Sequence, residues 1–91
     1  MIEKIGEAAM YEQLAEECAE LAQASLKVSR QLRGDNPPRM TPKEVWAGFN
    51  EEVADVWLCF KELGVRVDPD IVQFKKERFM KGCEEQKNQL L

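Results

Sequence analysis

Two clusters of turn-forming residues divide this chain, and they constrain its fold more than any other feature of the sequence. The first spans residues 33–40 and includes Gly34 and two prolines, and the second spans residues 64–69. In the segments that they separate, apolar residues recur at spacings of three and four, as on one face of an α-helix. No strand-like alternation is present. We therefore predict an all-α chain of three main helices.

Capping residues mark where these helices begin and end. Thr41 is a good N-cap, Pro42 suits the first helical position, and Glu44 can close a capping box. Gly34 and Gly64 are natural C-terminal stops. Asp and Pro at the end of the second cluster start the third helix in the same way. The predicted helices cover residues 7–33, 42–63 and 69–84, and we expect the polar tail after them to fray.

The apolar stripes of the first two helices define the expected core. The first stripe is Leu14, Cys18, Leu21, Ser25, Val28 and Leu32, and the second is Val45, Phe49, Val53, Val56, Phe60 and Leu63. Trp46 and Trp57 widen the second stripe, so this helix is expected to pack on two sides. A chain this short buries only about 60–65% of its unfolded surface. We therefore predict a single domain, residues 1–91, forming an antiparallel helical bundle completed by oligomerisation into a homodimer or tetramer.

Composition excludes several classes of function. Lys and Arg total 13 against 17 Asp and Glu, a net charge of −4 that disfavours binding to nucleic acid. The apolar runs are too short for a membrane-spanning helix or a signal peptide. The absence of His excludes histidine-based catalysis and Glu-x-x-His metal sites. Three dispersed Cys indicate reduced core thiols in a cytoplasmic protein.

Two pairs of acidic residues lie in unexpected places. Glu17 with Glu20, and Glu52 with Asp55, are each spaced i, i+3 near the middle of a helix, and Glu17 and Glu52 fall at the edges of the apolar stripes. Antiparallel packing would bring the four carboxylates together, where they repel unless pKa values rise or a cation binds. An all-oxygen ligand set favours Mg²⁺, or Mn²⁺, over Zn²⁺. The alternative interpretation is a solvated acidic face.

The spacing of these acids resembles that of a known family. The motif EExxE at residues 16–20, followed by ExxD at residues 52–55, is similar to the signature of MazG-like proteins, members of the all-α nucleoside triphosphate pyrophosphatase superfamily. The resemblance covers residues 10–82, most of the chain. It implies Mg²⁺-dependent hydrolysis of a (deoxy)nucleoside triphosphate to the monophosphate and pyrophosphate. It also suggests removal of aberrant nucleotides from the nucleotide pool.

The resemblance implies roles for individual acidic residues. Glu17, Glu20, Glu52 and Asp55 correspond to the metal ligands. Glu17 and the remaining motif glutamate, Glu16, are the candidate catalytic residues. For Glu16 two interpretations stay open: it orients a water or a ligand, or it faces solvent.

Basic residues of the third helix correspond to the phosphate contacts of the family. Lys75 and Arg78 match its K-x-x-R pattern and are expected to bind phosphate oxygens, with a solvated basic face as the alternative. A further basic residue is common four positions later, where this chain has Gly82. The linker between the acidic motifs is long because of its Asn-Pro-Pro insert at residues 36–38, which is either a lid or a plain connection.

Two other functions compete with the enzyme. The chain could be a non-catalytic oligomeric helical interaction module whose acidic patch is structural, or a nucleotide-sensing relative that has lost catalysis. Trp46, Phe49 and Trp57 are candidates for a wall against the nucleobase, but residues of this kind more often belong to a core or an interface.

Overall fold

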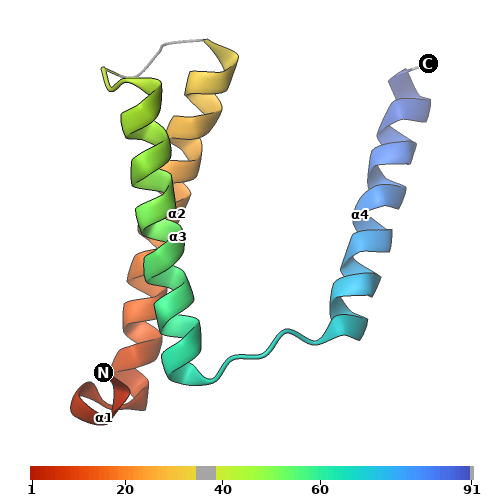
Figure 1. Ribbon diagram of the computed structural model, residues 1–91. Helices are drawn as coiled ribbons and strands as arrows, with labels where there is room; N and C mark the ends of the chain where they lie inside the picture. The colour runs from red at the N-terminus through yellow and green to blue at the C-terminus, as the bar shows by residue number, and fades with distance from the viewer. Residues whose placement is uncertain (35–38, 91) are drawn as a thin grey trace.

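The computed structural model describes residues 1–34 and 39–90 of the chain. These residues form four helices and no strand: α1 (Ile2–Ile5), α2 (Glu7–Arg33), α3 (Pro42–Leu63) and α4 (Pro69–Leu90) (Figure 1). The prediction of an all-α chain with three main helices is confirmed. The short α1 was not predicted. It ends at Gly6, whose φ of 90° favours glycine, and its Ile2 N–H donates to Glu62 Oε1 of α3 at 3.2 Å.

The capping residues read from the sequence set the ends of α2 and α3. Thr41 Oγ1 accepts a hydrogen bond from the Glu44 N–H at 3.2 Å, and its hydroxyl donates to Glu44 Oε1 at 3.0 Å. Gly34 and Gly64 end their helices in the left-handed conformation, with φ of 72° and 66°. The Asn-Pro-Pro insert at residues 36–38 lies outside the described residues.

The third main helix begins as expected but runs further than expected. Asp68 Oδ1 accepts from the Asp70 N–H at 2.9 Å, which satisfies a donor in the first turn of α4. The helix then continues beyond Glu84 to Leu90, past the predicted range of residues 69–84. Gln73 Nε2 donates to Glu77 Oε1 at 2.9 Å, an i, i+4 pair that supports an exposed helix.

The core lies between α2 and α3, which pack side by side as an antiparallel hairpin (Figure 1). Its buried residues are Met10, Ala24, Val28, Val45, Val56 and Cys59. The contact face of α2 is rotated from the predicted stripe, because Leu32 is 72% exposed and Cys18 is exposed as well. On α3, Cys59 is buried whereas Val53 and Phe60 are exposed. The prediction that all three Cys are core thiols is therefore wrong for Cys18 and Cys83, which are both exposed.

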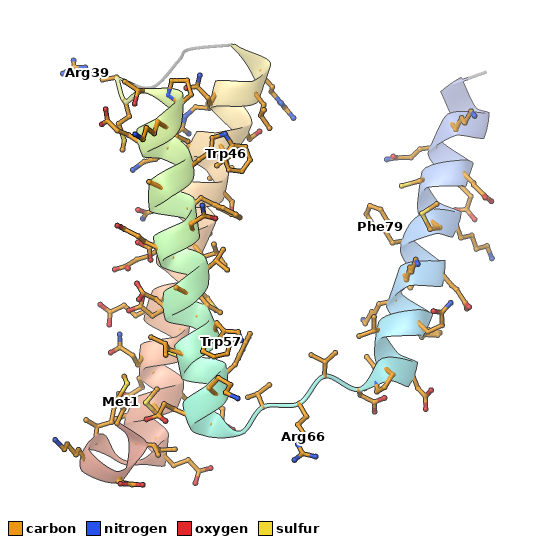
Figure 2. The ribbon with its side chains drawn as sticks, viewed as in Figure 1. Met1, Arg39, Trp46, Trp57, Arg66 and Phe79 are labelled. Atoms are coloured by element: carbon orange, nitrogen blue, oxygen red, sulfur yellow. The ribbon has the colours of Figure 1, made fainter. Side chains whose placement is uncertain are left out.

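Helix α4 stands apart from the hairpin (Figure 1). Among the described residues it packs against neither α2 nor α3. The radius of gyration, 17.3 Å, exceeds the roughly 12 Å expected for a compact domain of this length. Figure 2 shows Trp57 on the side of the hairpin nearer α4, and Phe79 on the side of α4 nearer the hairpin. Trp57 is 56% exposed and Phe79 is 71% exposed. Both elements therefore present apolar surface that nothing in the described chain covers.

Within the described ranges, no helix has both the length and the apolar character needed to cross a membrane.

Candidate metal centre

A glutamate occupies the middle of the buried face of α2. Met10, Glu17 and Ala24 follow one another at intervals of seven residues, about two helical turns, so they share one face of the helix. Met10 and Ala24 are buried against α3, and Glu17 between them is half-buried. Glu17 thus lies nearer the centre of the helix contact than the edge position predicted for it. The shift follows from the rotation of the contact face away from Leu32.

Helix α3 repeats the arrangement. Val45, Glu52 and Cys59 are again spaced by seven residues, with buried residues on both sides of a half-buried glutamate. Because α2 and α3 are antiparallel, the two glutamates meet near the middle of the hairpin. An isolated carboxylate in such a contact is costly, since it loses water without gaining a cation or a hydrogen-bond donor in its place.

Glu20 and Asp55 join these two glutamates. One carboxylate oxygen from each of Glu17, Glu20, Glu52 and Asp55 lies within 4.8 Å of the others. The structure therefore brings together all four residues that the sequence marked as metal ligands. Glu20 is exposed, so the cluster opens to solvent on at least one side.

Two oxygens of the cluster have no hydrogen-bond partner. Glu17 Oε2 and Glu52 Oε2 are buried, and neither has a donor among the described residues. The other oxygen of Glu17 accepts from Gln13 Nε2 at 2.7 Å, an i, i+4 contact along α2. Buried polar atoms are seldom left unpaired, and acceptor-only oxygens are satisfied either by a proton or by a cation. The unpaired oxygens therefore fit a hard divalent ion.

Burial and close contact with other carboxyl groups raise the pKa values of Glu17 and Glu20. Burial raises the pKa of Glu17, opposed by the Gln13 hydrogen bond and reinforced by the charges of Glu20 and Asp55. The pKa of Glu20 is raised mainly by its side-chain hydrogen bond with Glu52 and by the charge of that residue. Without a cation, Glu17 and Glu20 therefore hold protons more tightly than ordinary carboxyl groups do.

A buried thiol lies next to the carboxylates. Burial raises the pKa of Cys59, and the negative charges of Glu17 and Asp55 raise it further. The group is therefore kept as a neutral thiol, which is a poor ligand for a hard cation. The donor set that faces the centre of the cluster consists of oxygen atoms, as the sequence predicted.

Hollows border the cluster at both ends. Glu20 and Glu52 line a cavity of about 330 Å³ that extends toward the α2–α3 connection. Glu17 and Asp55 line another, of about 290 Å³, that extends toward α1. Space for a ligand therefore exists beside each pair of carboxylates.

The remaining predicted site residues lie outside this cluster. Glu16 is exposed on α2, near enough that its charge contributes to the raised pKa of Glu20. Lys75 and Arg78 share one face of α4 and line a hollow of about 440 Å³ there. Because α4 does not pack on the hairpin, the structure does not bring these two basic residues to the carboxylates.

Two features of the centre were missed from the sequence. The Gln13 amide that binds Glu17 could have been found from its i, i+4 spacing on the same helix face. The cavity beside Glu20 and Glu52 depends on how closely α2 and α3 approach, which residue spacing does not determine.

Comparisons with known protein families, with curated proteins and with solved structures find no match for this chain.

Proposed function

We propose that this protein hydrolyses a (deoxy)nucleoside triphosphate to the monophosphate and pyrophosphate with Mg²⁺ as cofactor, Mn²⁺ being a substitute. The observation that carries the proposal is the meeting of two half-buried glutamates, each with an unpaired buried oxygen, with two further carboxylates inside 4.8 Å. Such a cluster is destabilising without a cation. The EExxE and ExxD spacing of the same four residues supports the choice of reaction.

In this proposal the four carboxylates Glu17, Glu20, Glu52 and Asp55 hold the ion. A bound Mg²⁺ would neutralise charge on the phosphates and on the pyrophosphate leaving group. Glu17 is the candidate to accept the proton of the attacking water, because its carboxylate lies within the cluster that would hold the ion. Glu16, exposed beside it, is the candidate to orient that water.

Lys75 and Arg78 contribute phosphate contacts in the proposed assembly. Their charges suit phosphate oxygens, and the fork of Arg78 can bind two oxygens at once. The contact requires α4 to approach a hairpin, either that of its own chain or that of a second copy. A homodimer or tetramer would supply such a hairpin and would cover the exposed apolar residues of α3 and α4.

A second candidate function is a non-catalytic interaction module. The large exposed apolar side chains of α4, among them Phe74 and Phe79, favour it because they suit a protein partner as well as a second copy. A thermal-shift measurement separates the two functions. Stabilisation by Mg²⁺ together with a nucleotide supports a nucleotide site, whereas no shift supports the module.

Pyrophosphate release tests the proposed reaction. The full chain is incubated with each canonical and several damaged (deoxy)nucleoside triphosphates, with Mg²⁺ or with a chelator, next to Glu52→Gln and the control Glu51→Gln. Glu51 is the exposed neighbour of Glu52 and lies outside the cluster. We expect Mg²⁺-dependent release that Glu52→Gln abolishes and Glu51→Gln retains. Nucleotide binding without release would instead identify a sensor.

A further inference from the structure

The cavity beside Glu20 and Glu52 has one basic side chain, Lys27, among its three glutamates. It measures about 330 Å³ and lies between α2 and α3 on the side of the carboxylate cluster toward their connection. Glu20 and Glu52, two of the four clustered carboxylates, line it together with Lys27 and Gly48. One cavity thus combines half of the proposed cation centre with a basic side chain.

Gly48 is one of the residues that line this cavity. It lies within α3, where glycine costs roughly 1 kcal/mol of helix stability relative to alanine. A Cβ atom at this position would meet no other atom within 4 Å, so close packing of the helices does not require glycine. A larger side chain would instead extend into open space at the cavity. Gly48 therefore adds no side chain to the cavity that it lines.

Lys27 supplies the positive charge. It lies seven residues after Glu20 on α2, so both are on the same side of the helix, about 10 Å apart along its axis. Side chains on a helix lean toward its N-terminus, which directs Lys27 back toward Glu20. Within the described residues Lys27 forms no ion pair. The other acid of the cavity, Glu44, is engaged by the Thr41 hydroxyl at 3.0 Å.

We propose that this cavity binds the pyrophosphate portion of the substrate, with Lys27 contacting phosphate oxygens at the end away from the cation. The inference rests on the proposed function and assigns residues that the acidic motifs do not include. The hollow on the other side of the cluster has no lysine or arginine, and the amino group of Met1, which also lines it, is paired with Glu62 at 2.8 Å. Phosphate groups therefore have a cationic side-chain partner in the cavity of Lys27 and none in the other hollow.

Calorimetric titration of the full chain with inorganic pyrophosphate, in the presence of Mg²⁺, tests the assignment. Lys27→Met removes the charge, and Lys43→Met is the matched control on an exposed lysine outside the cavity. Gly48→Leu fills the cavity, and Ala47→Leu adds the same side chain at the exposed neighbouring position. Mn²⁺ binding and the melting temperature are measured for each variant.

We expect Lys27→Met and Gly48→Leu to weaken pyrophosphate binding at least tenfold, and both controls to bind within threefold of wild type. Mn²⁺ affinity should stay within threefold in every variant, and Gly48→Leu should not lower the melting temperature. Pyrophosphate binding by Lys27→Met or Gly48→Leu equal to that of its control would overturn the inference while leaving the hydrolase proposal intact. A wild-type chain that binds neither Mn²⁺ nor pyrophosphate would overturn both.

Discussion

Glu17 and Glu52 each occupy a position that an apolar residue would fill in an ordinary helix pair. Their flanking partners at seven-residue spacing, such as Met10 and Cys59, are buried and apolar. A carboxylate at such a position weakens the hairpin unless its charge is compensated. In the proposed metal centre, the two glutamates lower the stability of the metal-free hairpin and serve the binding of the cation.

Replacing Glu52 tests whether its charge destabilises the metal-free hairpin. Glu52→Gln removes one charge from a group of mutually repelling carboxylates, so we expect the metal-free melting temperature to rise or stay unchanged. A structural ion pair would give the opposite sign, because its loss leaves a partner uncompensated. Differential scanning calorimetry in the presence of a chelator measures the difference, with Glu51→Gln as control. A pronounced fall in melting temperature, confined to Glu52→Gln, would contradict the account.

Stability should also depend on pH in a direction set by Glu17 and Glu20. Their pKa values are raised in the folded chain, so their contribution is fully present below the ordinary value of 4.5 and is lost as the pH rises through the raised values. We expect this contribution to lower the metal-free melting temperature between about pH 5 and neutral pH, and Mg²⁺ to stabilise more at neutral pH than at about pH 5. The double variant Glu17→Gln/Glu20→Gln should lose this pH dependence. An unchanged slope in that variant would exclude the cluster as its source.

At the scale of elements, local signals in the sequence predicted the helices well. Thr41, Gly34 and Gly64 act through contacts within one turn, so their roles follow from neighbouring residues alone. The i, i+3 spacing of the acids likewise placed each pair on one helix face. The rotation of α2 against α3 did not follow from the sequence, because Leu14 or Cys18 could have faced the partner as plausibly as Met10. The position of α4 is a long-range property with no local signal.

Helix α4 carries Lys75 and Arg78, the residues of the proposed site that the structure does not place beside the carboxylates. If Arg78 binds a substrate phosphate, Arg78→Ala should reduce kcat/KM by about 10- to 150-fold, the worth of one charged hydrogen bond of roughly 1.5–3 kcal/mol. A rise in KM alone would indicate equal binding in ground and transition states, and a fall in kcat a contact made mainly in the transition state. Steady-state kinetics at saturating Mg²⁺ decide between these outcomes.

Lys76→Ala is the matched control for Arg78, since Lys76 follows Lys75 by one residue and so points away from the face that Lys75 and Arg78 share. We expect it to retain wild-type kinetics. A change below threefold in Arg78→Ala would mean that Arg78 belongs to a solvated face, and that other groups hold the phosphates.

At the scale of the whole molecule, α3 and α4 both expose large apolar side chains. The extended shape, with a radius of gyration of 17.3 Å, leaves side chains such as Trp57 and Phe79 uncovered. Large exposed apolar side chains on two separate helices favour the proposed oligomer. A second copy of the chain would cover them and could bring a basic α4 to an acidic hairpin.

Light scattering tests the assembly. We expect a particle of at least twice the chain mass of 10.5 kDa at micromolar concentration. Trp57→Glu should shift it toward the monomer, because it places a charge in the apolar surface that association would bury. A 10.5 kDa particle for the wild-type chain would contradict the proposed oligomer.

We propose that the four carboxylates of the hairpin form one binding centre for a divalent cation. Titration with Mn²⁺, followed by the loss of its free electron paramagnetic resonance signal, measures this binding without any assumption about the substrate. We expect wild type and Glu51→Gln to bind Mn²⁺ with equal affinity and Mg²⁺ to displace it. Glu52→Gln should weaken binding at least tenfold, because hard cations bind through carboxylate oxygens. Equal Mn²⁺ binding by wild type and Glu52→Gln, or no binding by wild type, would contradict this proposal.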